Sequence, residues 1–116
     1  MKLDSTVLYS NDIEKVTDFY KNIVGLELDY RQGDNFVSFK FTNGVRLGIK
    51  KAVEKREKPG AQTFFIRVDD AKATYEEMKK KKVNFHKKLT EESWGIEFAI
   101  LDPDKNKVEF LQRKQS

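Results

Sequence analysis

The amino-acid sequence predicts an α+β fold made of two modules, each with the element order β-α-β-β-β. Two observations support this fold class. The same succession of strand-like and helix-like segments occurs twice, and the helix starts at Asp12 and Asp70 lie half a chain length apart. A charged segment that ends in Pro-Gly separates the two halves. We therefore expect the first module at residues 1–51, a linker at 52–60 and the second module at 61–116.

The first module begins with residues 1–10, whose side chains alternate between the two faces of a strand. Asn11, with Glu14 three residues later, predicts a helix N-terminus with a capping box. Apolar residues at helical spacing continue this helix to about Ile23, and Gly25 stops it. Three strands joined by short turns are expected next, at residues 26–31, 35–41 and 45–50.

The second module repeats this order. A strand is expected at residues 62–68, and Asp69 or Asp70 caps a helix that extends to about Lys82. The remaining expectations are a strand at 83–87, a loop at 90–93 and a closing hairpin of strands 96–101 and 107–111.

The closing hairpin turns at residues 102–106, which read Asp-Pro-Asp-Lys-Asn. Pro103 has the φ that the second position of a type I turn requires, and the aspartates can accept hydrogen bonds from nearby backbone N–H groups. If Lys105 must adopt a positive φ, it costs roughly 1 kcal/mol. After the turn, Glu109 lies in mid-strand on the face opposite to Val108 and Phe110.

This hairpin resembles the end of a module in the vicinal-oxygen-chelate superfamily, which includes glyoxalase I, extradiol dioxygenases, fosfomycin-resistance proteins and bleomycin-resistance proteins. In that family an Asp-Pro-Asp-Gly-Asn turn leads into a strand with a metal-binding Glu. Further similarity lies in Trp94-Gly95, Asp12-Ile13-Glu14, Phe19-Tyr20 and Gly25-Leu26. The resemblance implies that the two modules form an eight-stranded, barrel-like cup with the helices outside. It also implies a homodimer, which would cover exposed strand edges.

Metal-dependent members of the family use four ligands, typically His or Gln on the first strand of each module and Glu on the last. The resemblance places these positions at Ser5, Gly48, Thr63 and Glu109. One carboxylate and two hydroxyls are a poor set for Zn²⁺, Ni²⁺ or Fe²⁺. We therefore expect no metal cofactor. The only histidine, His86, lies in a lysine-rich strand and is expected to be exposed.

Strand alternation predicts which side chains share a face with the four positions that correspond to the family's metal ligands, called the inherited positions below. Four cations, at Arg46, Lys50, Arg67 and Lys107, fall on this face, and one glutamate cannot neutralise all of them. The expected ligand is therefore a small anionic or aromatic molecule. The expected ligand-binding residues are Ser5, Val7, Arg46, Gly48, Thr63, Phe65, Arg67, Trp94 and Glu109.

Composition excludes several other classes of function. Without cysteine there are no disulfides, thiol nucleophiles or cysteine-ligated metals. The net charge of +4 comes largely from residues 50–58 and 79–82, where no aromatic side chains interleave with the basic ones, so a nucleic-acid partner is not expected. No apolar run approaches the roughly 20 residues of a membrane span. A cytoplasmic protein is the default expectation.

Three functions remain open from the sequence. The chain could be a metal-free binding protein that sequesters or senses a small molecule. It could be an enzyme, either a lyase or isomerase of the glyoxalase I type or one that uses Glu109 as a general base. It could also be an interaction module whose basic surface binds a partner.

Overall fold

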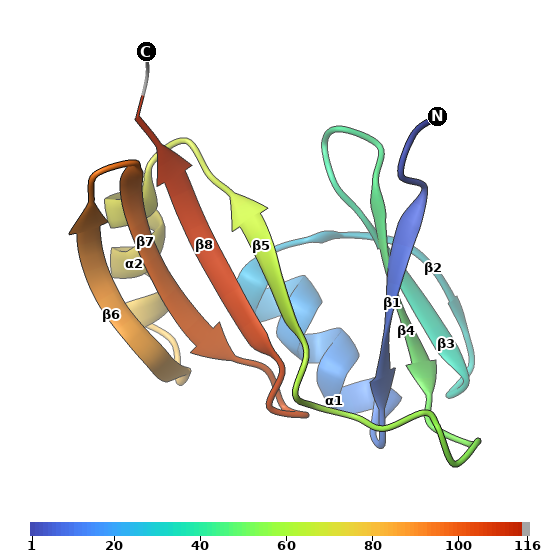
Figure 1. Ribbon diagram of the computed structural model, residues 1–116. Helices are drawn as coiled ribbons and strands as arrows, with labels where there is room; N and C mark the ends of the chain where they lie inside the picture. Colours follow the sequence, from blue (N-terminus) through green and yellow to red (C-terminus); the bar gives the residue numbers. More distant parts are fainter. Residues whose placement is uncertain (115–116) are drawn as a thin grey trace. The chain divides into compact units, whose positions relative to one another are not determined.

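The computed structural model describes residues 1–114 and contains two β-α-β-β-β modules (Figure 1). The chain divides after Gly60 into two compact units. Each unit has one four-stranded mixed sheet with a helical segment on one face. The predicted fold class is therefore confirmed. Below, the open face of a sheet is the face opposite its helix. Within residues 1–114, no helix is both long enough and apolar enough to cross a membrane.

The sheet of the first unit has the strand order β1-β4-β3-β2. Its edge strand β1 pairs in parallel with β4, and the other neighbours are antiparallel. The helical segment packs against β3 and β4, where the buried apolar side chains form a core. The strands are β1 (Ser5–Ser10), β2 (Glu27–Gln32), β3 (Phe36–Lys40) and β4 (Arg46–Lys51), and the core includes Leu8, Tyr20, Val37, Phe39, Leu47 and Ile49.

The helical segment of the first unit begins one residue later than predicted. Its N-cap is Asp12 and not Asn11, because Asp12 has extended backbone angles and its Oδ1 accepts a hydrogen bond from the Lys15 N–H at 3.1 Å. The first part, α1 (Ile13–Asp18), is α-helical, and the second, η1 (Phe19–Val24), is a π-helix. Gly25 ends the segment as predicted, with φ of 86°.

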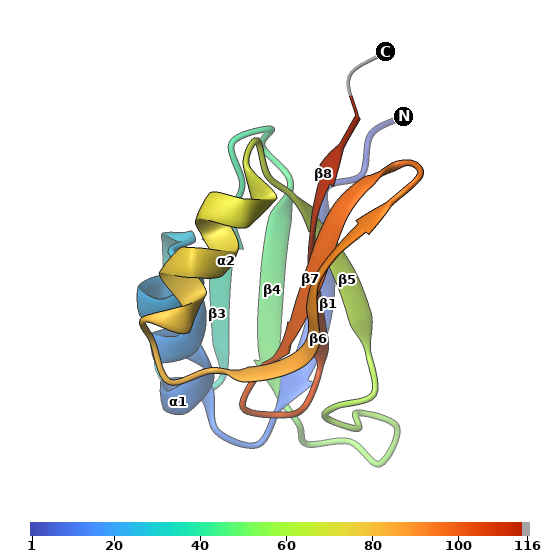
Figure 2. The same ribbon diagram turned by 90° about the vertical axis from the view of Figure 1, so that its left-hand side faces the viewer.

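The second unit repeats this arrangement with the strand order β5-β8-β7-β6. Helix α2 lies along one face of the sheet and contacts β6, β7 and β8 (Figure 2). The core under α2 is aromatic: the Phe98 ring stacks on Phe110 with centroids 4.9 Å apart, and Tyr75 meets Phe98 edge-on at 5.2 Å. The elements are β5 (Thr63–Arg67), α2 (Ala71–Lys79), β6 (Asn84–Glu92), β7 (Gly95–Leu101) and β8 (Lys107–Arg113).

Two boundaries in the second unit differ from prediction. Helix α2 is capped by Asp70, as expected, but ends at Lys79, before most of the lysine run. Strand β6 continues through Glu92, so the predicted loop at residues 90–93 is largely strand. Thr90 pairs with Glu97 across the sheet, and register shifts earlier in β6 allow this pairing. Sequence alternation did not reveal the extension, because the bulged strand loses its two-residue period.

The segment between the units is organised by a carboxylate. The Glu57 side chain is 2% exposed, and its Oε1 accepts hydrogen bonds from the backbone N–H groups of Val53 and Glu54, both at 3.0 Å. The Lys50 Nζ lies 2.7 Å from the same oxygen. The predicted linker therefore contains a turn that is tied to strand β4.

The hairpin turn at residues 102–106 yields a stability prediction. Lys105 has φ of 70°, a left-handed conformation that costs a side-chain-bearing residue roughly 1 kcal/mol. We expect Lys105→Gly to raise the free energy of unfolding by about 1 kcal/mol, measured by urea denaturation. Lys105→Ala keeps a Cβ and should give no such gain. Equal stability of the two variants would contradict the prediction.

The Glu57 turn yields a pH prediction. The hydrogen bond from Lys50, followed by those from the Glu54 and Val53 N–H groups, lowers the pKa of Glu57 from 4.5 to about 2. A depressed pKa means that ionised Glu57 stabilises the fold above pH 4.5, and that this contribution is lost as the pH falls toward 2.

We therefore expect Glu57→Gln to be less stable than wild type at neutral pH, with the difference shrinking across that window in thermal melts. Glu54→Gln, a change at an exposed carboxylate of the same turn, is the control. A Glu57→Gln deficit that stays constant with pH would show that the carboxylate charge does not stabilise the turn.

Candidate functional site

The candidate site lies on the open face of the second sheet, where Glu109 meets its cross-strand neighbours. Phe65 of β5, Glu109 of β8, Ala99 of β7 and Lys87 of β6 occupy one row across the sheet. The residues that flank Glu109 in β8 point toward α2 and are fully buried. The same alternation that builds the core therefore places Glu109 on the opposite face.

Glu97 of β7 joins Glu109 in a carboxyl pair. It lies on the same face, diagonally across the ladder, since it pairs with Leu111 while Glu109 pairs with Ala99. Both residues are largely buried, with 8% of Glu97 and 4% of Glu109 exposed, and their carboxyl groups are hydrogen-bonded to each other. Sequence reasoning missed Glu97, although its alternation with Phe98 and Ile100 along β7 carried the signal.

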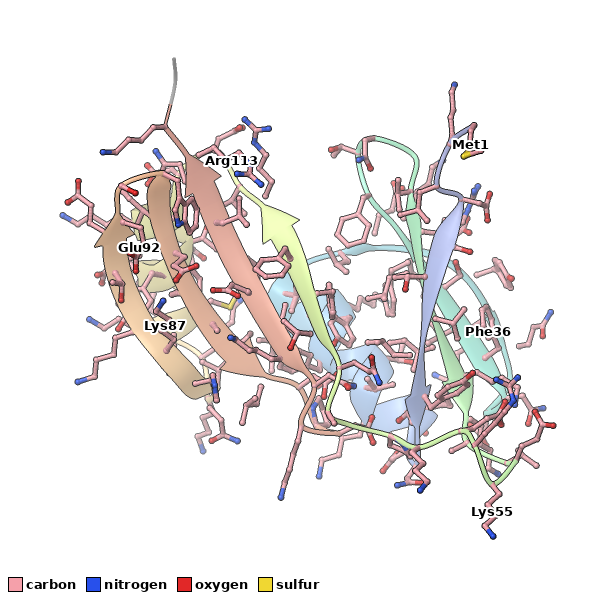
Figure 3. All side chains as sticks on the ribbon, viewed as in Figure 1. Met1, Phe36, Lys55, Lys87, Glu92 and Arg113 are labelled. Carbon is pink, nitrogen blue, oxygen red and sulfur yellow. The ribbon has the colours of Figure 1, made fainter. Side chains whose placement is uncertain are left out.

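Two lysines flank the carboxyl pair. Lys87 Nζ donates a hydrogen bond to Glu97 and also lies 3.7 Å from Oε1 of Glu92 (Figure 3). Lys107 Nζ lies 3.7 Å from Oε2 of Glu109. The side chain between Lys87 and Glu109 in the row is the small Ala99, which leaves room for the ammonium group.

These contacts shift the pKa values of the two carboxyl groups in opposite directions. Burial raises the pKa of Glu109, and the neighbouring Glu97 carboxylate raises it further. The hydrogen bond with Glu109, together with that from Lys87, lowers the pKa of Glu97 against the effect of burial. The bond to Glu97 in turn raises the pKa of Lys87. Glu97 is thus the preferred carboxylate of the pair, and Glu109 is the preferred carrier of a proton.

A pocket with a volume of about 380 Å³ lies on the same unit, and two of its lining residues are cross-strand partners of the carboxyl pair. It is lined by Phe65, Trp94, Leu111 and Arg113. The two aromatic side chains are well exposed for their size, Phe65 at 60% and Trp94 at 38%. Arg113 lies at the end of β8 (Figure 3). Of the lining residues, Phe65 and Trp94 were predicted from the sequence as ligand-binding, whereas Arg113 was not.

Two further predicted residues lie on β5. Arg67 pairs with Leu111 and shares the open face, and its side chain is exposed. Thr63 pairs with Lys107 on the same face and is also exposed. Within residues 1–114, neither Arg67 nor Arg113 takes part in an ion pair.

The remaining predicted site residues belong to the open face of the first sheet. Ser5 pairs with Arg46, and Val7 pairs with Gly48. The Phe36 ring of β3 lies over Gly48, so that a Cβ there would come within 2.7 Å of the ring's Cζ. In this unit, an aromatic side chain from the neighbouring strand, Phe36 (labelled in Figure 3), thus lies at the position that corresponds to Glu109.

Two cations of the first unit have partners that the sequence did not reveal. Arg46 Nε lies 2.8 Å from Oδ2 of Asp29, and Lys50 is bound by Glu57. Asp29 lies at a register shift in β2, where it also accepts a hydrogen bond from the Ser38 hydroxyl at 3.2 Å. The premise that Glu109 is the only carboxylate available to these four cations is therefore wrong for Arg46 and Lys50. His86, on β6, is exposed as predicted.

Known structures share this fold across nearly the whole chain. A lactoylglutathione lyase from Agrobacterium tumefaciens is 20% identical, covering 96% of this chain and 92% of its own, with a TM-score of 0.80. TnmS3, an antibiotic binding protein from Streptomyces sp. CB03234, is 21% identical, covering 98% and 97%, with a TM-score of 0.84. TioX from Micromonospora sp. ML1 is 14% identical, covering 98% and 100%, with a TM-score of 0.82.

At such identities these likenesses show the fold, which an enzyme and a binding protein share. No curated protein sequence matches the chain significantly. A family model, however, matches residues 2–110, nearly the full length. The chain belongs to the Glyoxalase/Bleomycin resistance protein/Dioxygenase superfamily.

Proposed function

We propose that this protein binds a small aromatic anion at the pocket of the second unit, without a divalent metal. The observation that carries the proposal is the combination of two exposed aromatic side chains, Phe65 and Trp94, with Arg113 in one pocket. Aromatic faces hold the flat apolar part of a ligand, and a guanidinium binds a carboxylate, sulfonate or phosphate through paired hydrogen bonds.

The charges on this face favour an anion over a cation. Lys87 and Lys107 are balanced by the carboxyl pair and by Glu92. Arg67 and Arg113 make no ion pair within the described residues 1–114, so the face as a whole is positive near the pocket. An anionic ligand would supply the missing partner charge, which is why we extend the predicted ligand class to this pocket.

The chemistry of the inherited metal positions supports binding without metal. Ser5 and Thr63 offer only neutral hydroxyls, and Gly48, under the Phe36 ring, offers no side-chain donor. Glu109 already shares a hydrogen bond with Glu97 and has Lys107 beside it. These residues do not fit Zn²⁺, Ni²⁺ or Fe²⁺, which favour imidazole, thiolate or several carboxylates.

A second candidate function is acid–base catalysis by Glu109. A buried carboxyl with a raised pKa, next to a pocket, is the arrangement that general acids require. In that case a bound substrate would exchange a proton with Glu109, and Glu97, held by Lys87, would keep the acidities of the two groups apart. Turnover lost in Glu109→Gln while ligand binding persists would distinguish this candidate from simple binding.

Ligand binding can be tested by thermal shift. Millimolar naphthalenesulfonate should raise the melting temperature, because ligand binding adds RT ln(1 + [L]/Kd) to the free energy of unfolding. Arg113→Ala and Arg67→Ala should each weaken binding roughly ten- to a hundredfold, because a charge-assisted hydrogen bond contributes about 1.5–3 kcal/mol.

The matched control is Lys80→Ala, an exposed cation just beyond α2, which should leave the thermal gain unchanged. Stabilisation by aromatic cations such as naphthylmethylammonium, with none by the sulfonate, would contradict the proposal.

Metal binding can be tested separately by calorimetric titration with Zn²⁺, Ni²⁺ and Fe²⁺. We expect no stoichiometric tight site, because the inherited positions supply a single carboxylate. Glu109→Ala is the diagnostic variant. A one-to-one site in the wild type that disappears in this variant would overturn the metal-free proposal.

A further inference from the structure

The turn that carries Trp94 is held against the end of strand β8. Strands β6 and β7 are joined by a two-residue turn, Ser93-Trp94, and Glu92 pairs with Gly95 across it. Figures 1 and 2 show that this turn lies at the end of the sheet where β8 finishes. There the Lys114 N–H donates a hydrogen bond to the Trp94 carbonyl at 2.9 Å. The tip of the hairpin is therefore bonded to the chain just beyond β8.

Gly95 lets the start of β7 approach β8 closely at this point. It pairs with Arg113, and a Cβ added to it would overlap the backbone oxygen of Gln112 and lie 3.1 Å from the Arg113 Cα. These neighbours are backbone atoms, so no change of rotamer can make room for a side chain. Position 95 therefore requires glycine for the two strands to lie this near to each other.

These two contacts act on residues that line the pocket. Trp94 lies in the turn and Arg113 in β8, and both line the pocket. Without the contacts, the Trp94 ring would sit on an exposed hairpin turn, a kind of segment that moves on the nanosecond to microsecond timescale. A ring that is already held in place costs less to order when a ligand binds. The contacts therefore favour binding without touching the ligand.

We propose that Gly95 and the Lys114 N–H are positioning groups of the ligand site, which hold Trp94 in place together with Arg113 before a ligand arrives. Neither Gly95 nor Lys114 is among the four residues that line this pocket in the described chain, so each acts through Trp94. This inference rests on the proposed function, since it gives both groups a role in binding the aromatic anion.

Two substitutions at position 114 isolate the hydrogen bond. Lys114→Pro removes the N–H donor, and the extended strand before it is compatible with a following proline. Lys114→Ala removes the same side-chain charge but keeps the N–H, so it is the matched control. We expect Lys114→Pro to weaken naphthalenesulfonate binding about two- to tenfold in calorimetric titration, because Trp94 must then be ordered on binding. Lys114→Ala should bind the sulfonate as the wild type does.

Gly95→Ala tests the close approach of the strands. We expect sulfonate binding at least about tenfold weaker, because the turn and the end of β8 must separate to admit the Cβ. Gly44→Ala, in the turn between β3 and β4, controls for lost stability. Its φ of 87° disfavours alanine, but no atom outside its chain neighbours lies within 4 Å of the added Cβ. This control should lower the urea midpoint and leave the sulfonate affinity unchanged.

Fluorescence gives a readout that lost stability alone would not change. Trp94 is the only tryptophan in the sequence, so time-resolved anisotropy without ligand reports the motion of this ring. We expect faster ring motion in Lys114→Pro and Gly95→Ala, and wild-type motion in both controls. Wild-type affinity or wild-type ring motion in Lys114→Pro, or in folded Gly95→Ala, would overturn this inference alone. Absence of sulfonate binding to the wild-type protein would overturn the proposed function, and this inference with it.

Discussion

The two-residue period of strands β7 and β8 is the constraint on which the second unit depends. In each strand, alternate side chains pack into the aromatic core under α2, and the others form the open face. A register shift of one residue would bury Glu97 and Glu109 against the helix and expose Phe98 and Phe110. A register shift moves the residues of both faces together. The stability of the core therefore also determines which side chains lie on the open face.

The fold was largely readable from the sequence because its signals are local. Asp70 as a helix cap, Gly25 as a helix stop and the Asp-Pro-Asp turn each act within a few residues of themselves. Errors arose where tertiary contacts overrode local preference. Asn11 is a good capping residue, but the extended backbone of Asp12 places the cap one position later. The extension of β6 depends on pairing with β7, which periodicity in β6 alone could not show.

The candidate site was predictable only in part, for a related reason. Alternation placed Glu109, Phe65 and Arg67 on one face, and it would also have placed Glu97 there had β7 been treated in the same way. The ion-pair partners of Arg46 and Lys50 could not be predicted from strand alternation. Asp29 acts from a bulged strand and Glu57 from a turn outside the sheets, so neither position follows from strand parity. The ion pairs of this protein therefore depend on which side chains the fold brings into contact, and the amino-acid composition alone does not reveal them.

The Phe36 ring over Gly48 has an evolutionary consequence. A Cβ at position 48 would lie 2.7 Å from the ring's Cζ, so a substitution there requires the Phe36 ring to move or to be replaced by a smaller side chain. The two positions are therefore epistatic, and the order of mutations matters. A larger side chain at position 48 is therefore reached most directly through a prior change at Phe36, because the ring occupies the space that the new side chain needs.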